Sequence, residues 1–198
     1  MPASKLPVDV VVIDTCVLIS NVLRFLTLGL AERGYFQPAW SPKIRDEWLR
    51  NASRLWAVDI AVLEKDWAEW DLTFPLADQG IVHNWIEGLS YSDPKDWHVI
   101  AAARAAQARF TPRSVSILTR NVKDFNRGEL RRLEIERWAP DAFFCALLPF
   151  ARLDLLRLLE DLPLAVKAPD KPALSVTELL KRERLFVLNQ FYQQQVIT

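Results

Sequence analysis

Four acidic side chains fall where an α/β protein gathers ligands. Asp14 ends one apolar run, Asp124 closely follows another, Asp96 opens a predicted helix, and Glu47 lies within a helix. Because parallel strands end at the sheet edge where helices begin, Asp14, Asp124 and Asp96 are expected to approach one another. Crowded carboxylates repel unless a cation neutralises them, and all-oxygen ligands favour Mg²⁺ or Mn²⁺ over zinc. Such a site activates water for phosphodiester hydrolysis.

Each acid also has a purely structural interpretation. Asp14 and Asp96 stand at helix starts, where carboxylates cap free N–H groups. Glu47 fits a solvated helix surface, and Asp124 fits a turn. The prediction of a metal site therefore rests on the combination of the four positions rather than on any one of them.

Strand and helix patterns alternate along the first 138 residues. Apolar runs predict strands at Val8–Ile13, Tyr35–Trp40, Val115–Thr119 and Ile135–Trp138. Helical spacing and caps predict helices at Thr15–Arg33, Ser41–Asn51, Leu55–Leu72, His83–Leu89, 93–106 and Gly128–Leu133. This order predicts a three-layer α/β/α sandwich with a mostly parallel sheet.

The pattern after Pro140 is helical and very apolar. It predicts a helix over Ala142–Leu162, a proline-containing linker over Pro163–Pro172, and a last helix running to about Tyr192. Ser175 and Glu178 form the capping-box signature that opens this last helix. We therefore predict two parts, a sheet domain over residues 1–138 and a helical C-terminal extension over residues 139–198.

Composition narrows the functional class. Lys plus Arg and Asp plus Glu each number 25, and this zero net charge argues against a general nucleic-acid binder. Acids predominate over Asp59–Asp96 and bases over Arg104–Arg137, which predicts an acidic pocket beside a basic rim. Cys16 and Cys145 lack ligand spacing and are expected to be buried, reduced thiols. Without a signal pattern or a membrane-length apolar run, we expect a soluble, cytoplasmic protein with no membrane association.

Four segments together resemble the PIN-domain nucleases, the metal-dependent ribonuclease fold of VapC-type toxins. They are VVVIDTCVLI at 10–19, SPKIRDEW at 41–48, DPKDWHVIAAA at 93–103 and ILTRNVKDF at 117–125. Their order and spacing cover about residues 8–138. The third segment looks like one branch in particular, often carrying a helical C-terminal extension.

The resemblance assigns roles to individual residues. Asp14, Glu47 and Asp96 match the acids that bind the metal, and Asp124 matches a later acid of the fourth motif. The position where the family commonly has its fourth acid holds Asn121, two residues after Thr119. These matches imply Asp14, Glu47, Asp96 and Asp124 as catalytic residues, supported by Thr15, Thr119 and Asn121.

The leading hypothesis is therefore a Mg²⁺- or Mn²⁺-dependent endoribonuclease, the toxin of a toxin–antitoxin pair. The resemblance implies an RNA substrate, products with a 5′-phosphate and a 3′-hydroxyl, and an antitoxin protein or a second copy as partner. Because Asn121 replaces an acid, a non-catalytic PIN-like module that binds RNA or protein is the alternative. A phosphatase with an aspartate nucleophile usually has a second Asp two residues later, and Cys16 stands there instead.

Basic and aromatic residues near these motifs have two interpretations each. Arg120, Lys123 and Arg127 either grip RNA phosphates or form a solvated face. The eight tryptophans suit base stacking, but core packing is the preferred interpretation. His98 follows Asp96 by two residues, about 200° around a helix, so it is expected to face away from the metal.

Overall fold

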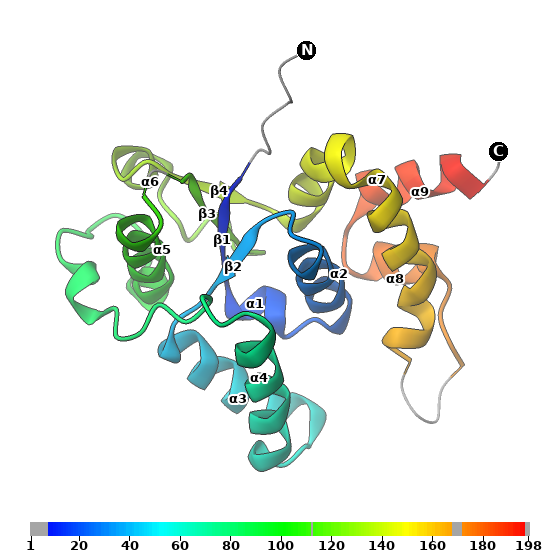
Figure 1. Ribbon diagram of the computed structural model, residues 1–198, viewed down its shortest axis with the longest axis horizontal. Coiled ribbons are helices and arrows are strands. Elements are labelled where there is room, and N and C mark those ends of the chain that lie inside the picture. The colour runs from blue at the N-terminus through cyan, green and yellow to red at the C-terminus, as the bar shows by residue number, and fades with distance from the viewer. Residues whose placement is uncertain (1–7, 112, 168–171, 197–198) are drawn as a thin grey trace.

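The computed structural model describes residues 8–111, 113–167 and 172–196. Its centre is a four-stranded, all-parallel sheet in the order β2-β1-β3-β4. The strands are β1 (Val10–Ile13), β2 (Gln37–Ala39), β3 (Val115–Leu118) and β4 (Ile135–Trp138). Helix α5 (Trp97–Arg109) lies on one face, and α2 (Asn21–Glu32) on the other, with α7 (Pro140–Ala165) packed outside α2 (Figure 1). The predicted α/β class with a helical extension is confirmed.

Strands β1 and β3 form the middle of the sheet. Every residue of both is buried, as β-branched and apolar runs require in a parallel sheet covered on two faces. Val12 pairs with Ile117, and the Asp14 N–H donates to the Leu118 carbonyl at 3.1 Å. The register therefore brings Asp14 and Thr119, which follow these two strands, to the same edge.

The single helix predicted over Thr15–Arg33 is two helices. A short α1 (Thr15–Leu18) precedes α2, and the Ser20 hydroxyl between them accepts the N–H of Leu23 at 3.2 Å. Because the Ser20 hydroxyl caps the first turn of α2, a second helix begins there although the apolar spacing continues without a break. Gly34, with φ at +81°, ends α2 as its position predicted.

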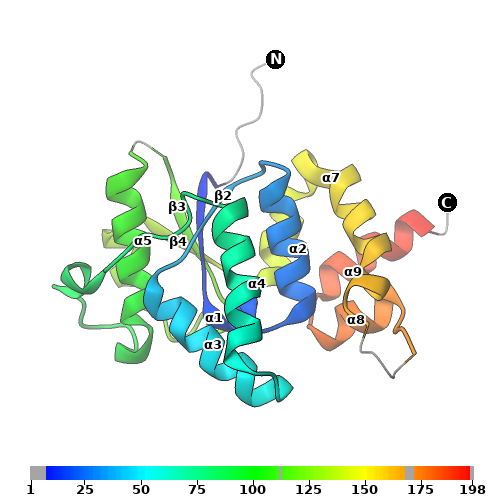
Figure 2. The ribbon, with the colours of Figure 1, turned by 60° about the horizontal axis from the view of Figure 1, so that its bottom comes forward.

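The helix predicted over Leu55–Leu72 was wrong at its start. Helix α3 (Pro42–Trp56) continues through Leu55 and ends at Ala57, which is left-handed with φ at 54°. Asp59 then caps α4 (Ile60–Thr73), so Leu55 and Val62 do not share a buried face and are 62% and 49% exposed. The two helices lie side by side at the end of the sheet where β1 finishes (Figure 2).

Two single turns and a short helix complete the predicted sheet domain. The 3-10 turns are η1 (His83–Ile86) and η2 (Pro94–Asp96), and α6 (Arg127–Arg132) joins β3 to β4. Asp93 caps η2 by accepting the N–H of Lys95 at 3.0 Å. Helix α5 begins only at Trp97, so Asp96 lies at its N-terminal boundary rather than inside it.

The C-terminal helices are α7, α8 (Val176–Arg182) and α9 (Phe186–Val196). Helix α7 contains Pro149, which cannot donate an N–H to the preceding turn, and has non-helical angles at Ala151. Helix α7 also includes Pro163, the predicted start of the linker, and residues 168–171 of that linker lie outside the described residues. The capping box at Ser175 is present, but the predicted last helix divides near Arg184.

One apolar cluster joins the sheet and the C-terminal helices. It extends from Val8 to Leu188, and α2 and α7 approach so closely at Gly29 that a Cβ there would lie 2.7 Å from a Leu158 methyl. Trp40, Trp48 and Trp67 are almost completely buried and contact one another or their aromatic neighbours, which confirms the packing interpretation for them.

Both cysteines are free thiols, and each is half-buried rather than fully buried as predicted. Among the described residues, no helix combines the length and apolarity that crossing a bilayer would need.

Candidate functional site

Asp14 occupies the centre of the candidate site. It leaves β1 and caps α1, and its side chain is only 5% exposed. Thr119 Oγ1 donates to Asp14 Oδ2 at 2.6 Å, and the Cys16 thiol donates to the same oxygen at 3.0 Å. The Cys16 N–H donates to the other oxygen at 3.4 Å. The Asp14 carboxylate therefore caps α1 and also accepts hydrogen bonds from two neighbouring side chains.

Thr119 links the ends of β1 and β3. Its hydroxyl, which is fully buried, donates to Asp14 and accepts the N–H of Asn121 at 3.0 Å. The Asn121 contact uses the backbone, and the residue itself is exposed. Thr119 thus fixes both the Asp14 carboxylate and the start of the loop that carries Asn121 and Asp124.

Replacing Thr119 with Val should lower nuclease activity about 10- to 100-fold, the usual cost of losing a group that orients a ligand. The change keeps the side-chain volume but removes the hydroxyl from Asp14 and Asn121. Steady-state cleavage rates of a labelled RNA measure the effect. Thr27→Val is the matched control, because the Thr27 hydroxyl is buried without a partner in the described chain. Equal activity of the two variants would contradict the role of Thr119.

Glu47 reaches the same edge from α3. Its Oε2 accepts a hydrogen bond from Thr15 Oγ1 at 3.3 Å and lies 3.2 Å from His98 Nε2. The imidazole is not aligned for a regular hydrogen bond, so we describe this pair as an electrostatic contact. Burial by itself would raise the pKa of Glu47, but His98, Lys43 and Thr15 together lower it below its usual value. Glu47 is therefore favoured in its charged form.

His98 was expected to face away from the site, and that expectation was wrong. Asp96 has φ at −101° and ψ at 0°, outside helical geometry, and α5 starts one residue later. The angular offset of an ideal helix therefore does not apply between Asp96 and His98. Only the boundary between η2 and α5 could have revealed this placement.

Asp96 is the acid most affected by its neighbours. Burial, followed by repulsion from Asp14 and Asp124, raises the pKa of Asp96 to about 6. Its side chain makes no capping hydrogen bond to α5, in contrast to the capping interpretation. Asp14 and Asp124 thus lie close enough to Asp96 to repel its carboxylate.

Asp124 lies in the loop after β3 and is half-buried. Its N–H donates to the Asn121 carbonyl at 2.9 Å, and its carbonyl accepts the N–H of Asp93 at 2.8 Å. The turn interpretation therefore holds for its backbone. Its carboxylate still contributes to the repulsion at Asp96.

The donor chemistry of this edge fits a hard divalent cation. The acids supply oxygen atoms, and the pKa of Asp96 is raised first by burial and then by repulsion from Asp14 and Asp124, the part that a cation would relieve. Within residues 8–111, 113–167 and 172–196, however, no three Asp, Glu, His or Cys side chains already converge as a metal-binding group. The described acids thus lie at the same edge, but their side chains do not converge on one point where a metal ion could be bound.

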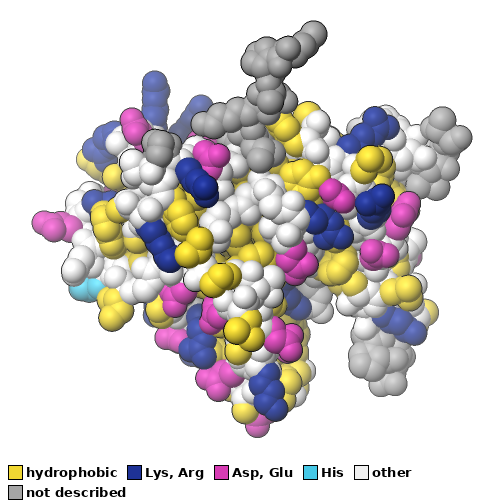
Figure 3. All heavy atoms as spheres, in the orientation of Figure 1, with side chains coloured by type: hydrophobic (Ala, Val, Ile, Leu, Met, Phe, Trp, Pro, Cys, Tyr) yellow, Lys and Arg dark blue, Asp and Glu magenta, His cyan; other side chains and the backbone are white. Residues whose placement is uncertain are grey.

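The basic residues occupy different surroundings. Arg120 Nη1 donates to Glu183 Oε2 at 3.0 Å, which ties the loop after β3 to the end of α8. Lys123 and Arg127 are exposed, and Arg127 lines a hollow of about 740 Å³ between α6 and β4. Figure 3 shows acidic side chains over α3 and α4, with Lys and Arg side chains among them.

Comparison with known proteins gives a family for most of the sheet domain. A family model described as "PIN domain" matches residues 10–123, which is more than half of the 198-residue chain. No curated protein and no solved structure matches the chain.

Proposed function

The chain belongs to the PIN-domain family, a nuclease-type fold, and from this premise we propose that it is a metal-dependent endoribonuclease. The observation that carries the proposal is the approach of Asp14 and Asp124 to Asp96 at one sheet edge, where both carboxylates repel that of Asp96. PIN-domain nucleases generally use divalent metals, and the oxygen donors here suit Mg²⁺ or Mn²⁺.

The proposed ligands are Asp14, Glu47 and Asp96, with Asp124 and Asn121 beside them. A bound divalent cation would supply charge neutralisation and a more acidic water molecule at this edge. Thr119 orients Asp14, while Thr15 and His98 orient Glu47. The low pKa of Glu47 keeps that carboxylate ionised at neutral pH.

Substrate binding is proposed for Arg120, Lys123 and Arg127, which follow the β3 strand and lie near the acids in sequence. Each exposed cation that meets a phosphate adds a salt-sensitive increment to affinity. Hydrolysis adds the oxygen of water to phosphorus and breaks the P–O3′ bond, so the products carry a 5′-phosphate and a 3′-hydroxyl.

We further propose a toxin role with an antitoxin partner, and a division into a nuclease domain (1–138) and a helical extension (139–198). The boundary falls between β4 and α7, although one apolar cluster crosses it. Co-purification of the untagged chain with the product of a neighbouring reading frame tests the partner.

The deciding experiment measures cleavage of single-stranded RNA with Mg²⁺, with Mn²⁺ and with a chelator. We expect cleavage that needs the metal and calorimetric binding of Mn²⁺ to the folded chain. The alternative, a non-catalytic binding module, is favoured by Asn121 and by the open arrangement of the described acids. Intact folding without Mn²⁺ binding or cleavage would overturn the proposal and favour that alternative.

Glu183→Gln should strengthen RNA binding, because it releases Arg120 and its neighbour Arg182 from their ion pairs with Glu183. For each released cation that meets a phosphate, the slope of log affinity against log salt should steepen by up to about 0.7 for a single strand. Fluorescence anisotropy over a salt series measures both. Glu160→Gln, which removes an exposed acid on α7, is the control. An identical change in both variants would mean that only net charge matters.

A further inference from the structure

Glu129 is a buried acid that the proposed chemistry does not use. It lies in the first turn of α6 and is only 2% exposed. Its Oε1 accepts the N–H groups of Ser90 at 2.7 Å and Tyr91 at 3.2 Å, and its Oε2 accepts that of Ser92 at 2.9 Å. A buried carboxylate is costly unless it is hydrogen-bonded, and this one is bonded to three successive backbone groups.

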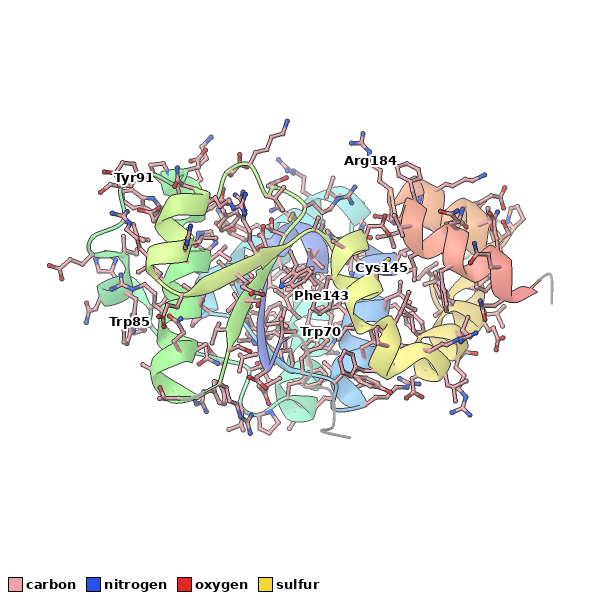
Figure 4. The ribbon with its side chains drawn as sticks, turned by 90° about the horizontal axis from the view of Figure 1, so that it is seen from above. Trp70, Trp85, Tyr91, Phe143, Cys145 and Arg184 are labelled. Atoms are coloured by element: carbon pink, nitrogen blue, oxygen red, sulfur yellow. The ribbon has the colours of Figure 1, made fainter. Side chains whose placement is uncertain are left out.

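The charge of Glu129 is compatible with this burial. Burial would raise its pKa, but the Ser92 hydroxyl and the three backbone N–H groups outweigh burial and lower the pKa. Charge-assisted hydrogen bonds of this kind are about twice as strong as neutral ones. The carboxylate therefore holds the backbone of residues 90–92 against α6. Figure 4 shows Tyr91 beside this helix, where the Arg132 guanidinium lies over its ring.

Further hydrogen bonds join the same segment to residues nearer Asp96 and Asp124. The Asn126 N–H donates to Ser92 Oγ at 2.9 Å, and the Asp93 N–H donates to the Asp124 carbonyl at 2.8 Å. Trp97 Nε1 donates to the Ser92 carbonyl at 2.9 Å, which connects the segment to the start of α5. Residues 90–97 and 124–129 are thus joined at several points.

These two segments carry Asp96 and Asp124, which repel each other. Arg137 of β4 donates to the carbonyls of Val122 and Phe125, so the Asp124 loop is also held to the sheet from its other side. Glu129 follows that loop directly and reaches across to the Asp96 segment. Its hydrogen bonds therefore act mainly to place residues 90–96 against a loop that is already fixed.

We propose that Glu129 is a positioning residue that holds the Asp96 segment against the Asp124 loop. It is not one of the proposed metal ligands and acts through the backbone of residues 90–92. The inference rests on the proposed function only in treating Asp96 and Asp124 as site acids. The attachment itself is a property of the fold and is measurable without catalysis.

Two substitutions of Glu129 distinguish the effect of its charge from the effect of its side-chain length. Glu129→Gln keeps the length and one acceptor oxygen but loses the charge, whereas Glu129→Asp keeps the charge but is one methylene too short. Hydrogen exchange on the full chain should show at least about tenfold faster exchange at residues 90–93 in the Asp variant, and a smaller increase in the Gln variant. Leu158→Ala, which destabilises α7 away from these loops, is the control.

Activity gives the second readout. Glu129→Asp should lower kcat and Mn²⁺ affinity about 10- to 100-fold, with the Gln variant between it and the wild type. Leu158→Ala, assayed well below its melting temperature, should retain both. Unchanged exchange at residues 90–93, or equal losses in Glu129→Asp and Leu158→Ala, would overturn the inference. A wild-type chain without cleavage would instead overturn the proposed function, and the exchange result would still decide the role of Glu129.

Discussion

Replacing Asp14 with Asn is expected to abolish metal-dependent RNA cleavage, with a loss of at least about 100-fold, because removing a proposed metal ligand should cost more than removing the groups that orient it. The fold should survive the change. Asparagine caps helices as well as aspartate does, and its amide oxygen still accepts one of the hydrogen bonds from Cys16 or Thr119. The measurements are cleavage rate and calorimetric Mn²⁺ affinity, each compared with the wild type.

Asp59→Asn provides the matched control for this experiment. It makes the same carboxylate-to-amide change at another helix cap, where Asp59 accepts the N–H of Ala61 on the exposed start of α4. Activity should be unchanged in this variant. An Asp14→Asn protein that cleaves as fast as Asp59→Asn would remove Asp14 from the site.

Replacing Asp96 with Asn should abolish cleavage and yet stabilise the metal-free protein. The wild-type carboxyl has its pKa raised to about 6, so between about pH 4 and 6 the folded chain binds more protons than the unfolded chain. The free energy of unfolding of the wild type therefore contains a contribution that falls as pH rises through this window. The Asp96→Asn variant has no carboxyl at this position, so its free energy of unfolding does not contain this fall.

The expected gain for Asp96→Asn at pH 7.5 in a chelator is about 1 kcal/mol, after allowing for solvent screening of a half-exposed group. That corresponds to roughly 2–4 °C in Tm for a chain of this size. Thermal melts from pH 4 to 8 measure it, and the difference between variant and wild type should vanish near pH 4. Added Mg²⁺ should stabilise the wild type more than the variant. A variant that is less stable at every pH would contradict the repulsion at this edge.

The sequence was most informative where a local pattern is compatible with only one kind of element at that place in the chain. The Val10–Ile13 run could be buried on both faces only as a central strand, and it placed Asp14 at the sheet edge. The cap and proline at Ser41-Pro42 likewise marked the true start of α3. Three of the four predicted acids, Asp14, Asp96 and Asp124, interact in the structure.

The failures occurred where local caps and turns interrupted the periodicity, or where contacts between distant segments decided the role of a residue. The break at Ser20 and the left-handed Ala57 interrupt apolar patterns that look continuous in sequence. His98 was misplaced because a 3-10 turn precedes α5. Glu129 lies between arginines and looks like a surface acid, and nothing local reveals that three backbone groups from residues 90–92 surround its carboxylate.

The close packing of α2 and α7 has a consequence for how the chain folds during translation. The ribosome releases β1, Asp14 and α2 long before α7, which carries the Leu158 side chain that packs against Gly29. It also releases Arg120 before Glu183, with which Arg120 forms an ion pair. Synthesis proceeds at about 5–20 residues per second, so the strands are available to fold before α7 and α8 have been made. The sheet would therefore emerge with the outer face of α2 still uncovered, and full assembly of the site's surroundings would wait for the last helices. A nuclease built in this way would have a delay between synthesis and activity that comes from the order of its own elements.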